Sequence, residues 1–135
     1  MTKEEVIDII KDAGFGFLAT SEGQQPRVRP MSPVLTDAGR LLLALLPQCR
    51  TIPQIKENPQ VELCWVDRKM SYCRMTGKAT MTEDLENKKL LWDTVPSMKQ
   101  YFSGPEDPNF HLVEIEVQGV EAMTPHQQQP EVVAF

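Results

Sequence analysis

Short extended segments, separated by turn-forming residues, dominate the first third of the chain. Phe15 to Thr20 is an apolar run, and the sequence Ser21-Glu22-Gly23 that follows it is typical of a turn. The next segment, Pro26 to Val34, contains Pro30 and Pro33. These prolines exclude a helix and favour an edge strand or a bulge, because proline has no backbone N–H to donate to a neighbouring strand. The pattern therefore predicts strands joined by tight turns.

Four later segments have the same character and bring the number of predicted strands to six. The loop Thr36-Asp37-Ala38-Gly39 is typical of a hairpin and joins the second strand to the third. The last segment alternates apolar with polar residues, as a strand with one buried face does. The four segments are Leu41–Leu46, Val61–Val66, Tyr72–Met81 and Phe110–Val117.

Helical patterns flank and interrupt these strands. Thr2 and Glu5 have the spacing of a capping box, and apolar residues then recur at helical spacing until Gly14 ends the helix. Further helices are predicted at 51–57, from 85 to 92 and, as a short stretch, at 96–102. This order of elements favours a mainly β, α+β domain over residues 1–123, built as an antiparallel barrel or roll. Residues 124–135 form a tail without periodicity, which we expect to be mobile unless a partner subunit orders it.

Composition limits the function classes. Nineteen Asp and Glu against fourteen Lys and Arg give a net charge of −5, which disfavours a general binder of nucleic acid or of an acidic membrane. The chain begins with an acidic, polar segment and its three cysteines form no C-x-x-C pair, so the cytoplasm is the expected compartment. The two histidines lack metal-ligand spacing, and no metal site is predicted.

Arg27, Arg29 and Arg50 are basic groups near a predicted strand and a predicted helix start. They favour either a bound phosphate or ordinary surface ion pairs with the many carboxylates, and the residues alone leave both open. Trp65 and Trp92 could stack on a ligand ring, but large aromatic side chains on strands and helices more often bury area in the core.

The order and spacing of four stretches resemble the pyridoxamine-5′-phosphate oxidase-like family of FMN-binding split barrels, and its small general-stress-protein type of member in particular. The resemblance covers about residues 5 to 122. The four stretches are Phe17–Thr20 with Pro26–Met31; Leu41–Leu46 with Cys49–Thr51 and Gln54–Pro59; Arg74–Ala79; and the block from Leu91 through Tyr101-Phe102 to Phe110 and the strand after it.

The resemblance implies a six-stranded antiparallel split β-barrel that forms a homodimer and binds FMN at the subunit interface. Arg29 then matches an arginine near the flavin phosphate, and Arg50 and Thr51 take the place of an Arg-Lys phosphate pair. Ten cofactor-binding residues follow from the match: Arg29, Pro30, Met31, Ser32, Ala44, Leu45, Arg50, Thr51, Gln54 and Tyr72.

The chain departs from the family pattern at Thr51, where the family has lysine. A charge-assisted contact is typically worth about 1.5–3 kcal/mol, so the loss weakens the expected phosphate site. The C-terminal substrate motifs of the true oxidases are absent too, and pyridoxamine-phosphate oxidation is not predicted.

The resemblance therefore implies an FMN-binding flavoprotein that acts as an oxidoreductase on a small molecule, and we expect it in the cytoplasm. Neither its catalytic residues nor its substrate are identified. Three alternatives stay open. They are an enzyme of the same fold with another cofactor (a deazaflavin or haem), a non-catalytic module that binds flavin or senses redox state, and a structural dimer with an empty cleft.

Overall fold

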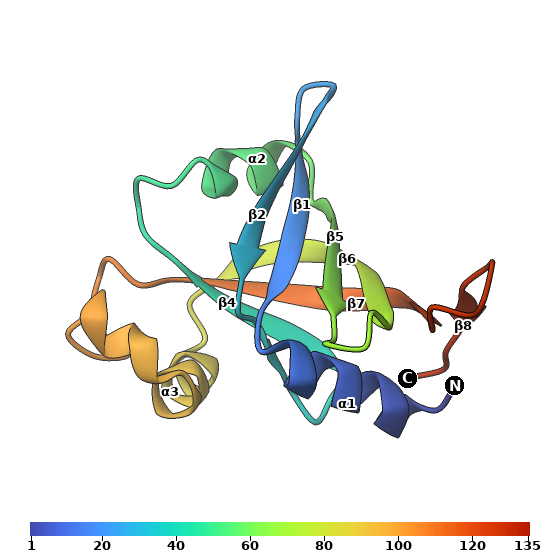
Figure 1. The fold of residues 1–135 in the computed structure, drawn as a ribbon. Coiled ribbons are helices and arrows are strands. Elements are labelled where there is room, and N and C mark those ends of the chain that lie inside the picture. The colour runs from blue at the N-terminus through green and yellow to red at the C-terminus, as the bar shows by residue number, and fades with distance from the viewer.

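One antiparallel sheet with helices around it makes up the chain (Figure 1). The computed structural model describes residues 1–135. The strands are β1 (Gly16–Glu22), β2 (Gln25–Met31), β3 (Val34–Leu35), β4 (Arg40–Leu45), β5 (Gln60–Val66), β6 (Tyr72–Thr82), β7 (His111–Met123) and β8 (Glu131–Val132). The helices are α1 (Lys3–Ala13), α2 (Thr51–Glu57), α3 (Leu85–Thr94) and the 3₁₀ helix η1 (Pro96–Gln100).

The strands follow the order β2-β1-β5-β6-β7-β4-β3, and β8 pairs with β7. Figure 1 shows β1 and β2 crossing β4 and β7 at a steep angle, so the sheet folds over on itself instead of lying flat. β2 pairs only with β1 and is an edge strand, as Pro30 within it predicts. β2 and β3 end the path and do not pair with each other, so the sheet is not closed within one chain.

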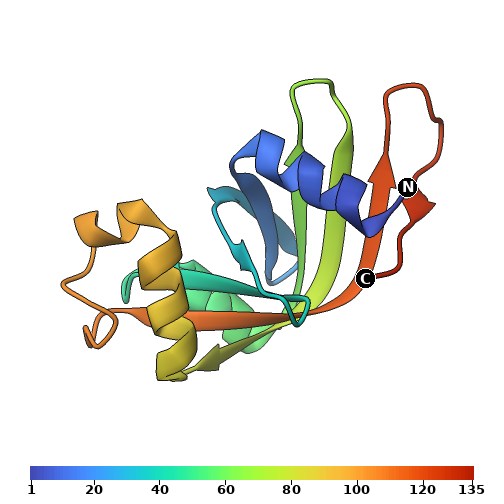
Figure 2. The same cartoon turned by 90° about the horizontal axis from the view of Figure 1, so that it is seen from below.

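β4 is buried on both faces, which explains its uninterrupted apolar sequence. Leu41, Leu43 and Leu45 belong to a core cluster of 19 residues that also contains Val6 and Ile9 of α1. Leu42, on the opposite face, belongs to a second cluster formed with α3, η1 and β7. Figure 2 shows α1 and α3 covering separate parts of the sheet. The members of the second cluster are Leu42, Leu91, Met98, Phe102, Phe110 and Leu112.

Most predicted elements are confirmed. Thr2 and Glu5 make both hydrogen bonds of a capping box, and Gly14 ends α1 at a φ of 80° that suits glycine. Trp65 is core, with 1% of its surface exposed, and Trp92 packs against the second cluster. No helix is long and apolar enough to cross a membrane.

Two predictions differ from the structure. The chain has eight strands instead of six, because β3 and β8 have two residues each and carry no periodicity, and β7 extends six residues beyond Val117. The segment after Thr124, expected to be mobile, packs on its own chain: Val133 is 5% exposed and its N–H donates to the Val120 carbonyl at 2.9 Å. These contacts join residues that are distant in sequence, so no local pattern marks them.

Gly77 lies where the β6–β7 register shifts, between Thr76 and Gly77. A Cβ at this position would lie 2.6 Å from the Glu116 carbonyl oxygen and 2.6 Å from Ile115 Cγ2. Backbone cannot give way as a flexible side chain can, so the two strands approach this closely only because residue 77 is glycine.

We predict that Gly77→Ala lowers the free energy of unfolding by about 1–3 kcal/mol, because it overpacks the strand pair. Urea unfolding of the variant measures the loss. Gly104→Ala is the matched control, since a Cβ there meets nothing within 4 Å, and it should change stability by less than about 0.5 kcal/mol. Equal effects at the two positions would contradict the close-approach argument.

Candidate functional site

A cavity of about 580 Å³ lies between the end of β2, β4 and the α3–η1 segment. Twelve of its fifteen lining residues are hydrophobic, and none is Asp, Glu, Lys, Arg or His. Such a cavity suits the flat, apolar part of a small molecule. The lining consists of Phe15, Pro30, Met31, Ser32, Leu43, Ala44, Leu45, Leu46, Cys49, Leu91, Val95, Ser97, Met98, Tyr101 and Phe102.

Half of the predicted site residues line this cavity. Pro30, Met31 and Ser32 come from the end of β2 and the residue after it, and Ala44 and Leu45 come from the end of β4. Pairing of β1 with β2 fixes Met31 opposite Gly16, and pairing of β4 with β7 fixes Ala44 opposite Leu112. The sheet therefore brings together two stretches that are separate in sequence.

The buried amide of Gln54 is the centre of a polar network beside the cavity. Its Oε1 accepts hydrogen bonds from Thr20 Oγ1 at 2.6 Å and from the Arg29 guanidinium at 2.7 Å. Arg29 also donates to the Leu18 carbonyl at 3.1 Å, and burial lowers the pKa of its guanidinium. These contacts orient Arg29 along the α2 end of β1 and β2.

Glu22 joins the network from the end of β1. Its carboxylate accepts from Arg50 at 2.7 Å, from Arg27 at 3.0 Å and from Gln54 Nε2 at 3.0 Å. The hydrogen bond from Gln54, followed by those from Arg50 and Arg27, lowers the pKa of Glu22 from 4.5 to about 2. Glu22 is therefore ionised at all physiological pH values.

The cavity and the polar network are contiguous along the chain at two points. On β2, Arg29 of the network precedes Pro30 of the cavity, and before α2, Cys49 of the cavity precedes Arg50 of the network. Thr51, the first residue of α2, is 6% exposed beside Arg50. Residues of the apolar cavity and arginines of the network are thus neighbours along the chain at both points.

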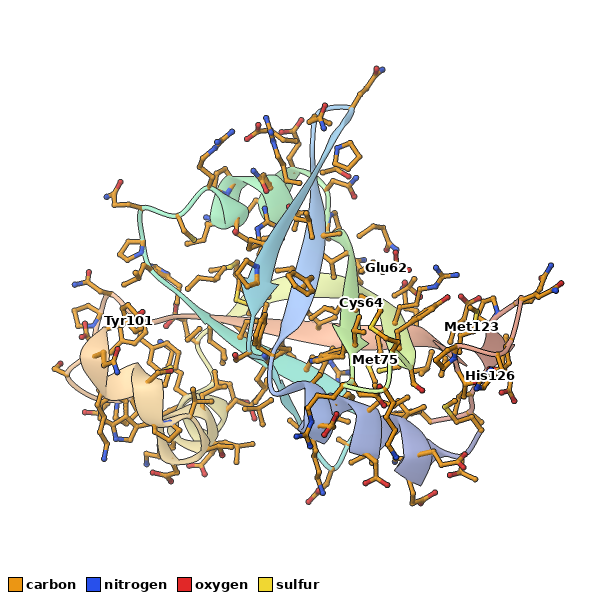
Figure 3. The ribbon with its side chains drawn as sticks, in the orientation of Figure 1. Glu62, Cys64, Met75, Tyr101, Met123 and His126 are labelled. Atoms are coloured by element: carbon orange, nitrogen blue, oxygen red, sulfur yellow. The ribbon has the colours of Figure 1, made fainter.

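Tyr72 lies apart from the other predicted site residues. It pairs with Met123 across β6 and β7, and its hydroxyl lies 3.7 Å from Met123 Sδ. Figure 3 shows Met123 near β8, at the opposite side of the molecule from Tyr101 of the cavity. Within one chain, Tyr72 therefore does not contribute to the cavity, and its assignment stays a prediction.

Sequence reasoning missed the part of the cavity contributed by α3 and η1, and it read Glu22 only as part of a turn. Leu91, Val95 and Met98 had the apolar pattern of an ordinary packing helix, which says nothing about what the helix covers. Tyr101 lines the cavity although 59% of its surface is exposed. The adjacent aromatic pair Tyr101-Phe102 is the one local sequence signal in this region.

Comparison with known proteins decides the family. A family model described as Pyridoxamine 5′-phosphate oxidase matches residues 2–124. The chain belongs to this family. It is 26% identical over 132 residues to General stress protein 26 of Bacillus subtilis (strain 168), a match that covers 95% of this chain and 92% of the relative.

Solved structures of similar proteins have the same fold. A nimC/nimA family protein from Clostridium acetobutylicum superposes with a TM-score of 0.82 at 28% identity, covering 96% of this chain and 89% of that one. General Stress Protein 26 from Bacillus anthracis str. Sterne gives a TM-score of 0.81 at 28% identity and 98% coverage of both chains. The predicted mainly β fold with flanking helices, a pyridoxamine 5′-phosphate oxidase-like split barrel, is thereby confirmed.

More distant structures share the fold alone. They include an FMN-binding protein from Nostoc punctiforme PCC 73102, with 16% identity, a TM-score of 0.74 and coverage of 96% of this chain and 88% of that one. A heme-binding protein from Mycobacterium smegmatis has 18% identity and a TM-score of 0.78, with coverage of 96% of this chain and 56% of that one.

The low pKa of Glu22 predicts a pH-dependent stability. A carboxyl whose pKa is about 2 in the folded chain and 4.5 in the unfolded chain stabilises the fold fully above pH 4.5, and this contribution is lost as the pH falls towards 2. The difference in unfolding free energy between wild type and Glu22→Gln should therefore be largest above pH about 5 and shrink below it. Urea unfolding from pH 2 to 7 measures it. A difference that stays constant over this range would show that Glu22 is not ion-paired in solution.

Proposed function

We propose that the chain is an FMN-binding flavoprotein of the pyridoxamine 5′-phosphate oxidase family that acts as an oxidoreductase on a small-molecule substrate. The observation that carries the proposal is the contiguity of the apolar cavity with the arginines of the polar network. FMN has the matching shape: a flat ring system at one end and a phosphate at the other. The family membership and the FMN-binding protein that shares the fold support the same cofactor.

The charges near the network fit a phosphate monoester. Arg27, Arg29 and Arg50 carry three positive charges and Glu22 one negative charge, which leaves +2. A phosphate monoester carries about −1.5 to −2 at pH 7. Arg29 and Arg50 would hold the phosphate as bidentate donors, with Thr51 and Gln54 beside them. Thr51 takes the place of the family lysine, so the arginines supply the positive charge.

The cavity would hold the ring. Pro30, Met31, Ser32, Ala44 and Leu45 lie on the side contributed by the sheet, and α3 with η1 lies opposite. Bound flavin supplies the redox chemistry, as an acceptor and donor of electrons. The chain's own residues would position the ring through apolar contacts, because the lining carries no charged side chain.

We propose further that two chains associate and complete the site. Phe15 and Phe17 stand in edge contact with their ring centroids 5.7 Å apart, and they are 50% and 42% exposed. Val28 on the edge strand is 69% exposed. Exposed apolar side chains beside a ligand cavity favour a covered interface. A contact of Tyr72 with the cofactor would have to be made across this dimer, which we place in the cytoplasm.

A second candidate is a non-catalytic module that binds flavin or senses redox state. The absence of Asp, Glu, Lys, Arg and His from the lining favours it, since these residues most often transfer protons to or from a substrate. Another cofactor, haem or a deazaflavin, is the remaining alternative, and the heme-binding protein of the same fold keeps it in view. A visible spectrum separates flavin from haem directly.

The proposal predicts that the purified protein, mixed with excess FMN and desalted, retains about one flavin per chain. Arg50→Ala should weaken FMN binding by about 10- to 100-fold, because it removes one charge-assisted contact to the phosphate. Arg68→Ala is the control: Arg68 is also an exposed arginine in an ion pair, with Asp12, and it belongs neither to the cavity lining nor to the polar network. Fluorescence titration with FMN measures both. Protein that is colourless after desalting, with Arg50→Ala equal to wild type, would overturn the proposal.

A further inference from the structure

The carboxylate of Glu22 binds arginines of the network to which the proposed ligand would bring its own negative charge. Arg27 lies on β2, and Arg50 is the residue just before α2. Both donate to the same oxygen, Glu22 Oε1, at 3.0 and 2.7 Å. Arg50 donates in addition to Oε2 at 2.9 Å. Two guanidinium groups repel each other unless an anion lies between them, and here the chain supplies that anion itself.

Gln54 couples this carboxylate to the arginine nearest the cavity. The two ends of its side-chain amide have opposite tasks, since Nε2 donates to Glu22 Oε2 at 3.0 Å and Oε1 accepts from Arg29 at 2.7 Å. Gln54 is only 5% exposed, and Thr20 Oγ1 fixes it from the other side at 2.6 Å. A change at Glu22 therefore affects Arg27 and Arg50 directly, and Arg29 through Gln54.

We propose that Glu22 is an internal competitor for the anionic end of the ligand, and that it sets the affinity of the site for a phosphate monoester. An incoming anion must displace the carboxylate from Arg27 and Arg50 or share these arginines with it. A singly charged group gains little by this exchange, whereas a phosphate dianion brings a second charge and three strong acceptor oxygens. The inference rests on the proposed function, because that proposal places the phosphate at Arg29 and Arg50, and Arg50 is one of the two arginines that Glu22 holds.

The side-chain exposures allow such an exchange. The Arg50 side chain is 70% exposed, and those of Arg27 and Glu22 are 44% and 37% exposed. Long exposed side chains of this kind change rotamer without disturbing the core. Gln54 and Thr20 are buried and stay in place. Arg29 stays directed by its own hydrogen bonds to Gln54 Oε1 and to the Leu18 carbonyl.

The test compares wild type, Glu22→Gln and Glu114→Gln with two ligands, FMN and riboflavin. Glu114→Gln is the matched control, because Glu114 is also a glutamate paired with an arginine, Arg40 at 3.0 Å, and it lies outside the network and the cavity lining. Glu22→Gln should bind FMN about tenfold more tightly, since the competing charge is gone. Riboflavin has the same ring without phosphate, so its affinity should stay the same in all three proteins.

Measuring stability and FMN affinity together distinguishes a competing role of Glu22 from a purely structural one. Glu22→Gln should lower stability and raise FMN affinity in the same protein, which a purely structural role does not produce. Weaker or unchanged FMN binding by Glu22→Gln, with FMN still bound by wild type, would overturn the inference and leave the proposed function standing. An equal gain in FMN affinity in Glu114→Gln would show that the effect comes from net charge alone, and it would overturn the inference as well.

Inorganic phosphate gives a readout that does not depend on flavin. The side-chain amide signal of Gln54 in NMR spectra should shift on titration with phosphate, with a lower dissociation constant in Glu22→Gln than in wild type. The absence of tighter phosphate binding in Glu22→Gln overturns the inference whether or not FMN binds. Tighter phosphate binding without any FMN binding would support the role of Glu22 and refute the proposed cofactor.

Discussion

The burial of β4 on both faces is the constraint on which the rest of the structure depends. Leu41, Leu43 and Leu45 pack into the main core under α1, while Leu42 packs against α3, η1 and β7. A strand that must be covered on both sides holds the two packing regions at a fixed distance from each other. The end of the same strand lines the cavity through Ala44 and Leu45, so the cavity is built on one of the most constrained parts of the fold.

The candidate site consists of an apolar cavity and a polar network. Burying the Gln54 amide would be costly without partners, and the chain satisfies it with Thr20, Arg29 and Glu22. Arg29 is thus directed by hydrogen bonds before any ligand arrives, while Arg27 and Arg50 are held by a carboxylate that lies partly in solvent. Arg29 is therefore held in place, whereas Arg27 and Arg50 can exchange their partner.

The family's fold is kept in this chain. Family membership rests on a match over residues 2–124, and the solved General Stress Protein 26 from Bacillus anthracis agrees over 98% of the chain. Thr51 stands where the resemblance expects lysine, and it is buried at the start of α2. Under the proposed function, lysine is missing at this position and Glu22 neutralises part of the arginine charge, so both features would weaken the attraction for an anion.

The sequence by itself determined what short-range rules control. The capping box of Thr2 and Glu5, the edge position of β2 and the bounds of α2 followed from spacing and residue type. Five residues that the family resemblance predicts for the site also line one cavity, although they come from two separate stretches of the chain. Tertiary structure alone decided the rest: β8 pairs with β7, α3 and η1 close the cavity, and Glu22 meets Arg50 across 28 residues. The physical reason is that caps and turns are local hydrogen-bonding choices, whereas a cavity wall or an ion pair exists only when distant segments are packed together.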